Sequence, residues 1–294
     1  MSEKEIDQAS GIETTGHEWD GIKELNNPLP RWWLWTFYAT IVFSIGYMIW
    51  YPAIPLWNSS TMGISGTTNR GILAEELKAV AESRRSTIEK LASTDLEAIR
   101  ANTELSRFAS AGGSSLFKVY CSQCHGSGAA GSAGYPNLND DDWLWGGDLE
   151  SIYTSIKHGI RNDADDDARD SLMPSFGADE LLESDDIAAV TEYVLQLSEN
   201  EFDASKAAAG REIFADNCAS CHGEDGRGDR EFGAPNLADS IALYGSDRAS
   251  LKAQIHKPNH GVMPPWGDKL TEAGIKQLVI YVHGLGGGEK AKAE

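Results

Sequence analysis

Cys121-Ser122-Gln123-Cys124-His125 and Cys218-Ala219-Ser220-Cys221-His222 are two copies of one pattern, and together they contain all four cysteines of the chain. The pattern C-x-x-C-H is typical of covalent c-type haem attachment. Each thiolate adds to one haem vinyl group, and the histidine that follows is placed to ligate the iron. Disulfides, zinc knuckles and a thioredoxin-like motif are the alternatives, but none requires a histidine after both second cysteines. The sequence therefore predicts two covalently bound c-type haems.

A second ligand for each iron is expected from methionine. Only Met173 and Met263 follow the haem motifs, and each precedes a proline that restrains its loop. Core packing is the alternative role of a methionine. The competing ligands are His158, His256 and His260. We expect His125 and Met173 to ligate one iron, and His222 and Met263 the other, which leaves no iron position open for oxygen or peroxide.

The two motifs lie in repeats offset by about 98 residues. Pro136-Asn137-Leu138 matches Pro235-Asn236-Leu237, and Tyr193-Val194 near the end of one repeat matches Tyr281-Val282 in the other. Each repeat reads as a helix, the haem motif, a loop, a second helix, a loop that contains Met173 or Met263 (the Met loop), and a last helix. The pattern predicts an all-α protein with tandem domains. The expected boundaries are 113–200, 201–286 and a C-terminal tail of 287–294.

On these features the repeats resemble class I cytochrome c domains. The resemblance implies that the carbonyl of Pro136 accepts a hydrogen bond from His125, and that of Pro235 one from His222. Such bonds orient the ligand ring and tune the metal. The nearby tryptophans fit haem packing or propionate contacts, and ordinary core packing equally well; they are Trp143, Trp145 and Trp266.

The N-terminal third has a different composition. No charged residue lies between Arg31 and Arg70, and residues 32–57 are mostly apolar with tryptophan near both ends. This pattern predicts one transmembrane helix with interfacial aromatic belts. A signal peptide is the competitor, but residues 1–31 carry seven acidic and three basic side chains, unlike a short basic leader. Residues 58–112 are expected to form a helical linker, either packed on another subunit or solvated.

Charge on the two sides of this helix does not decide its orientation. The haem motifs do, because c-type haems are attached on the outer face of the bacterial inner membrane. We therefore expect a single-pass protein of that membrane, with residues 1–31 cytoplasmic as an N-terminal tail and both haem domains periplasmic.

The run from His17 to Trp33, HEWDGIKELNNPLPRWW, resembles the N-terminus of the CcoP (FixP) family of dihaem subunits of cbb3-type cytochrome c oxidases. With one anchor and two haem motifs in that order, the resemblance covers nearly the whole chain. It implies electron relay from a soluble or membrane-bound donor cytochrome c to the oxidase core, with the catalytic and monohaem subunits as partners. A freestanding shuttle, a subunit of another respiratory complex and a dihaem peroxidase are the alternatives.

The net charge of −20 argues against nucleic-acid binding, which needs clustered Lys and Arg. Acidity is concentrated in residues 113–200, with 17 acidic against 4 basic side chains. Such a field would steer a basic donor, although acidity also serves solubility. The segment Asp163–Asp170 resembles a calcium loop only superficially, because Ala168 and Pro174 occupy the positions that need Gly and Glu.

Overall fold

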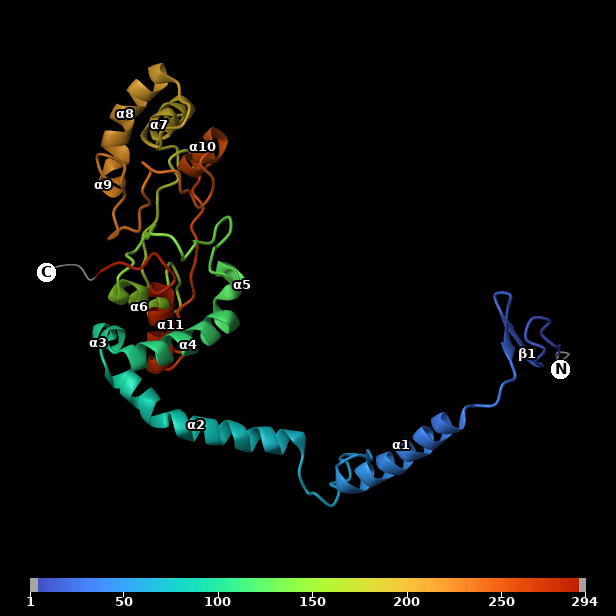
Figure 1. Ribbon diagram of the computed structural model, residues 1–294. Helices are drawn as coiled ribbons and strands as arrows, with labels where there is room; N and C mark the ends of the chain where they lie inside the picture. Colours follow the sequence, from blue (N-terminus) through green and yellow to red (C-terminus); the bar gives the residue numbers. More distant parts are fainter. Residues whose placement is uncertain (1–4, 291–294) are drawn as a thin grey trace. The chain divides into compact units, whose positions relative to one another are not determined.

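The computed structural model describes residues 5–290, with helices and strands labelled in Figure 1. The chain forms two compact units, Met1–Ser83 and Arg84–Glu294. Helices dominate, and the sheet found in the described residues has only two strands. The predicted all-α class is confirmed, with one small sheet in addition.

A β-hairpin precedes the apolar helix. Strands β1 (Thr14–Trp19) and β2 (Ile22–Leu25) are antiparallel and are joined by Asp20-Gly21. Both turn residues have positive φ, 50° and 84°, and Asp-Gly is a favoured pair for such two-residue hairpin turns. Residues 1–31, expected only as a tail, therefore contain ordered structure, and the Asp-Gly pair is its signal in the sequence.

Helix α1 (Arg31–Trp50) contains the apolar segment, and none of its residues is buried within the described structure. At 1.5 Å per residue its length is about 30 Å, which matches the hydrocarbon core of a bilayer. The helix is shorter than the expected span of 32–57, because Pro52 disfavours helical geometry at the residue before it. The chain then turns back, and the amide of Ser65 donates to the carbonyl of Trp50 at 2.9 Å.

The linker is helical but is not a separate spacer. Helix α2 (Asn69–Ser93) leads to α3 (Leu96–Ala101), whose N-cap Asp95 accepts from the Ala98 amide at 2.8 Å. The second compact unit, Arg84–Glu294, contains both haem motifs and is called the haem-bearing unit. Leu96 in α3 is buried within it. The C-terminal part of the expected linker, residues 58–112, therefore contributes apolar side chains to a core of this unit.

Eight further helices bear or surround the haem motifs. They are α4 (Thr103–Tyr120), α5 (Ser122–His125), α6 (Leu149–His158), α7 (Ser184–Leu197), α8 (Ala204–Asn217), α9 (Ala219–His222), α10 (Arg248–His256) and α11 (Glu272–His283).

A first core forms where α4 crosses α11. Gly113 permits the close approach, because a Cβ there would lie 2.1 Å from the carbonyl oxygen of Gln277. The rings of Phe117 and Tyr281 meet with centroids 5.4 Å apart. The buried members of this first core are Leu91, Leu96, Ile99, Leu105, Ala109, Phe117, Ala129, Leu149, Ile152, Ile156, Ala273, Ile275, Leu278, Val279, Ile280 and Val282.

A second core forms in the same way where α7 crosses α8. A Cβ on Gly210 would lie 2.1 Å from the carbonyl oxygen of Ala189. The ring of Tyr193 packs edge-on against Phe214 at 5.2 Å. The buried members of this second core are Phe176, Ile187, Val190, Tyr193, Val194, Phe214 and Ile255.

Each haem motif is therefore closed by the last helix of the other repeat: α11 packs on α4 and α6, and α7 packs on α8 and α10. The closing helices are thus exchanged between the two expected sequence repeats, 113–200 and 201–286. Only six residues separate α7 from α8, and so short a connection favours packing of the two as an antiparallel pair. Because α7 packs beside the second haem motif, the first motif is covered by α11, the last helix of the other repeat.

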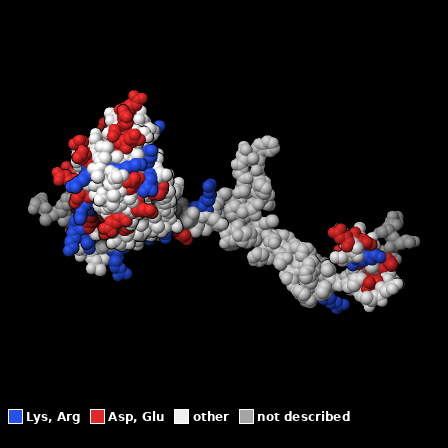
Figure 2. Space-filling model, turned by 90° about the horizontal axis from the view of Figure 1, so that it is seen from above, with Lys and Arg blue, Asp and Glu red and all other residues white. Residues whose placement is uncertain are grey.

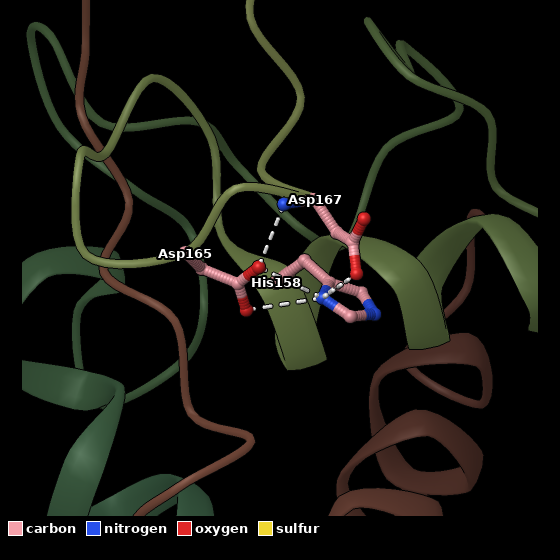
Figure 3. Close-up of side chains that lie close together, drawn as sticks. All are labelled: His158, Asp165 and Asp167. Carbon is pink, nitrogen blue, oxygen red and sulfur yellow. Dashed lines mark hydrogen bonds and ion pairs between the residues drawn. The ribbon is translucent and has the colours of Figure 1, made fainter.

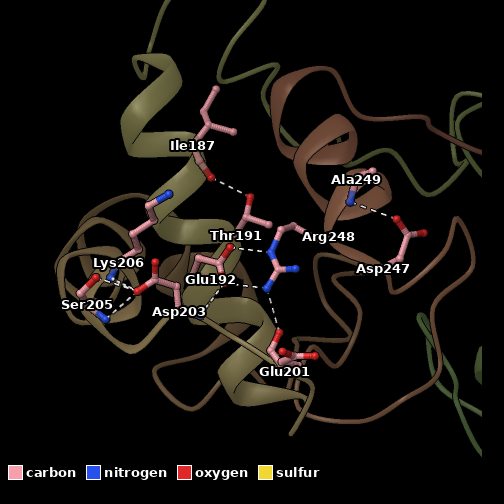
Figure 4. A network of polar contacts seen from close by, with 10 residues as sticks. All are labelled: Ile187, Thr191, Glu192, Glu201, Asp203, Ser205, Lys206, Asp247, Arg248 and Ala249. Atoms are coloured by element: carbon pink, nitrogen blue, oxygen red, sulfur yellow. Dashed lines mark hydrogen bonds and ion pairs between the residues drawn. The ribbon is translucent and has the colours of Figure 1, made fainter.

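Polar contacts hold α7 in the second core. The buried carboxylate of Glu192 accepts from Arg248 of α10 at 2.6 and 3.1 Å, and from the amide of Asp203, the N-cap of α8, at 2.8 Å (Figure 4). One carboxylate thus joins three helices, and its burial is offset by charge-assisted hydrogen bonds.

Candidate haem-binding sites

Each motif occupies one helical turn directly after a long helix. Cys121 ends α4, and its carbonyl accepts from the amides of Cys124 at 3.1 Å and His125 at 3.0 Å. The corresponding bonds in the second motif measure 3.1 and 2.9 Å. Residues three and four apart lie on one helix face, so two thiols and one imidazole face the same side. All four thiols are free of disulfides.

The proximal histidines are oriented by proline carbonyls. Nδ1 of His125 lies 3.0 Å from the carbonyl oxygen of Pro136, and Nδ1 of His222 lies 3.1 Å from that of Pro235. Burial lowers the pKa of both rings, against a smaller opposing effect of these carbonyls. A neutral ring that donates from Nδ1 keeps its Nε2 lone pair for a metal. The contacts implied by the resemblance are thus present in both motifs.

The first cysteine of each pair contacts an apolar core. Cys121 packs against the first core and Cys218 against the second. Burial, reinforced by the neighbouring cysteine, raises the pKa of each of these two thiols to about 11. Cys124 is exposed and Cys221 has intermediate exposure, so each motif offers a second thiol outside the core for a group attached through both cysteines.

The methionines occupy the reverse of the expected arrangement. Met263 packs against the first core together with Cys121, whereas Met173 packs against the second together with Cys218. The backbone of Met263 pairs with Ile160 through two hydrogen bonds of 2.9 Å. The structure therefore does not bring His125 together with Met173, or His222 with Met263, in one core. This packing is the reverse of chain order, because the loops that contain Met173 and Met263 cross over together with the closing helices.

Two of the three competing histidines have polar side-chain contacts. Figure 3 shows His158 at the end of α6, where Nδ1 lies 3.0 Å from a carboxylate oxygen of Asp165 and 3.9 Å from one of Asp167. Nε2 of His260 accepts from the amide of Met173 at 3.1 Å. Burial and the charge of Arg161 lower the pKa of His260, which favours the neutral, accepting ring. His256 is exposed.

A bound haem would bring two propionates, and the structure contains donors for a carboxylate. Trp145 is buried, yet its Nε1 has no hydrogen-bond partner among the described residues, and the same holds for Nε of Arg169. The Arg169 guanidinium lies 5.4 Å from the Trp145 ring. Buried donors of this kind are costly unless a ligand satisfies them. Thiols, imidazoles and unsatisfied donors together fit c-type haems.

Trp143 and Trp266, the two other tryptophans that fit haem packing, have partners within the protein. Nε1 of Trp143 donates to the Gly287 carbonyl at 2.7 Å, and Trp266 packs against the first core and against Tyr120. Arg169 has no local signal in the sequence, because it meets its partners only in the fold.

Two C-x-x-C-H turns, each with its own His–Pro contact and its own methionine, define a dihaem c-type cytochrome with an N-terminal apolar helix. Residues 11–58 match the model of the N-terminal domain of cytochrome oxidase-cbb3, FixP. Residues 109–194 and 205–282 match that of cytochrome c oxidase, cbb3-type, subunit III.

Curated relatives match this chain over nearly its whole length. The cbb3-type cytochrome c oxidase subunit CcoP of Cereibacter sphaeroides is 56% identical over 290 residues, with 98% of this chain and all of the relative covered. The FixP subunit of Rhizobium etli is 51% identical with the same coverage, and CcoP of Rhodobacter capsulatus is 49% identical over 95% of this chain and 97% of its own. The chain belongs to the CcoP/FixP family of cbb3-type cytochrome c oxidase subunits.

Proposed function

We propose that the protein is the membrane-anchored dihaem subunit that passes electrons from a donor cytochrome c to the core of a cbb3-type oxidase. The observation that carries this proposal is the pair of complete donor sets, each containing two thiols, an oriented imidazole and a thioether on one core. When bound, each haem supplies a reversible one-electron change at its iron. The chain itself holds the irons and presents them to partners; oxygen reduction belongs to the core subunits.

We infer a crossed set of iron ligands: His125 and Met263 would hold one iron, and His222 and Met173 would hold the other. The packing of each methionine on the core of its proposed partner supports this assignment. Cys121 and Cys124 hold one haem, and Cys218 and Cys221 the other. A thioether as the sixth ligand raises the reduction potential and closes the iron to external ligands, which suits a relay and disfavours a peroxidase.

The donor is proposed to dock beside the two Met loops. Leu172 and Val262, the residues before the two methionines, are each 59% exposed. Both line a surface depression of about 440 Å³ whose rim carries carboxylates. The acidic lining residues are Asp163, Asp165, Asp166 and Asp170. Figure 2 shows acidic side chains spread over the visible face of this unit, with basic ones between them.

A depression lined by exposed apolar side chains and several carboxylates suits a basic redox protein, because charge steers the encounter and apolar contact completes it. Leu172 and Val262 adjoin both proposed ligands, so a donor at this position would approach both irons. We therefore propose that the partner is a lysine-rich cytochrome c, either soluble or membrane-bound.

We also propose that α1 spans the bacterial inner membrane with the β-hairpin on the cytoplasmic side and the haem motifs on the periplasmic side. Covalent haem attachment supports this orientation. The hairpin exposes Trp19, Ile22 and Leu25, and such side chains beside a membrane anchor suit docking on the oxidase core.

Gentle detergent extraction from the native membrane tests the proposal. We expect the chain to purify with b-type haem, a carbon monoxide-sensitive signal and oxygen uptake with reduced cytochrome c. Low-spin c-type haem alone, without oxygen uptake, would favour a freestanding shuttle. Peroxide-driven turnover by the isolated chain would favour a peroxidase. Reaction of a membrane-impermeant amine reagent with Lys23 in intact spheroplasts would contradict the proposed orientation.

A further inference from the structure

The two Met loops are joined at their crossing point by one side chain. Nε of Arg161 donates to the carbonyl of Ser171 at 2.7 Å, and one of its terminal nitrogens donates to the carbonyl of Gly261 at 3.1 Å. Ser171 and Gly261 hold equivalent places, each two residues before a methionine. One guanidinium therefore contacts the same position of both Met loops.

Both the backbone and the side chain of Arg161 are held in a restricted conformation. Its backbone has φ of +50°, a left-handed conformation that is uncommon for a residue with a side chain. Strained residues of this kind persist where the surrounding structure determines them and often lie at functional sites. Burial lowers the pKa of the guanidinium, and the Trp145 ring lies 5.8 Å from it. Both hydrogen-bond acceptors are neutral carbonyls, so the arginine does not serve a simple ion pair.

The backbone next to Arg161 strengthens the same junction. Ile160 pairs with Met263 through two hydrogen bonds of 2.9 Å. The amide of Met173 donates to His260, which lies in the opposite loop. Arg161 itself donates its amide to Arg169 at 2.7 Å. The two loops therefore form one hydrogen-bonded assembly centred on residues 160 and 161.

We propose that Arg161 is a shared positioning residue that holds both methionines against their irons, so that the two ligations depend on each other. The proposal rests on the proposed function, because it requires Met173 and Met263 to be axial ligands. A planar guanidinium with several fixed donors can bind two carbonyls in a defined geometry, whereas the single ammonium of lysine cannot reproduce that fork.

The test measures exchange of the methionine ligands in the haem-loaded oxidase complex. Ferric haem with a thioether ligand has a weak long-wavelength charge-transfer band, and imidazole abolishes this band only after the methionine has left. In Arg161→Gln we expect loss of the band to be about tenfold faster at both haems of this chain, because each loop loses a charge-assisted hydrogen bond. Arg227→Gln is the control, since Arg227 is exposed and pairs only with Asp225 among the described residues.

The outcomes separate this inference from the proposed function. Acceleration at both haems supports the shared role; acceleration at one haem or at neither overturns it. Absence of the charge-transfer band from the wild-type chain would instead overturn the proposed ligation. If Arg161→Gln does not load haem, Arg161→Lys provides the test by amide hydrogen exchange: faster exchange at both Met173 and Met263 supports the proposal, and faster exchange at only one or at neither overturns it.

Discussion

Tyr193 of α7 packs edge-on against Phe214 of α8, with ring centroids 5.2 Å apart, although the two residues belong to different sequence repeats. Phe117 and Tyr281 form the equivalent contact for the other motif. Because each repeat donates its last helix, α7 or α11, to the core of the other, the two repeats form a single folded unit. Neither repeat can complete its core without the other, which suits a relay whose two irons must keep a constant relation.

The helix crossing predicts a strong effect of a small substitution. Gly210→Ala would place a methyl group 2.1 Å from the carbonyl of Ala189, so α7 and α8 must separate. We expect a loss of about 2–3 kcal/mol in the free energy of unfolding, measured by thermal melting of the loaded chain. Gly128→Ala is the matched control, because a Cβ there meets no atom within 4 Å. Equal stability of the two variants would contradict the crossing.

The crossed ligands can be tested with a spectral label. In Cys124→Ala the first haem keeps one vinyl group, which moves its visible bands to longer wavelength. In this background we expect Met263→Ala to convert the haem with the shifted bands to a form that binds carbon monoxide. Met173→Ala should instead convert the haem of the second motif, whose bands are not shifted. Met62→Ala, outside both cores, should change neither. If Met173→Ala instead removed the shifted low-spin band, His125 would pair with Met173, as chain order predicts.

The linker should contribute to the stability of the haem-bearing unit. Lys276 of α11 donates to the carbonyls of Ala92 and Thr94 at 2.8 Å each, where α2 ends. We expect Lys276→Met to lower the free energy of unfolding by about 2 kcal/mol, because both carbonyls lose a charged donor. Lys252→Met, at an exposed position of α10, is the control. Equal melting temperatures for the two variants would mean that the linker is not integrated.

Asp142 should make stability depend on pH. Burial, together with the carboxylate of Asp239 and other acidic neighbours, raises the pKa of Asp142 from 3.8 to about 6. Between these values the folded state binds more protons than the unfolded state, so this group makes stability fall as pH rises through that window. We expect Asp142→Asn to be more stable than wild type at pH 7 and to lose that advantage near pH 4. A difference that does not change with pH, measured by urea unfolding, would contradict the assignment.

The donor surface predicts a salt-dependent rate. In the double variant Asp163→Asn, Asp166→Asn, we expect slower reduction by a lysine-rich cytochrome c at low ionic strength and convergence with wild type at high salt, because screening removes steering. Asp268→Asn, an exposed acidic residue that does not line the depression, is the control. Rates that equal wild type at low salt would reject this surface as the docking site.

Much of the site was predictable because its chemistry is local. The spacing Cys121, Cys124 and His125 places three groups on one face of one helical turn, whatever the rest of the chain does. The apolar stretch of α1 is likewise visible in composition, although its end at Trp50 depends on Pro52. The hairpin had a signal in Asp20-Gly21, a turn pair that fits no helix.

The haem chemistry, the apolar helix and the presence of two equivalent repeats follow from the order of the residues alone, because each depends on a local pattern. The core on which each methionine packs depends on the fold, because Met173 and Met263 follow equivalent helices and carry equivalent local signals. The choice depends on packing between segments more than a hundred residues apart: the short connection pairs α7 with α8, and α11 then closes on α4. The partners of Arg161 and Trp145 depend on the same crossing, so no local pattern could reveal them.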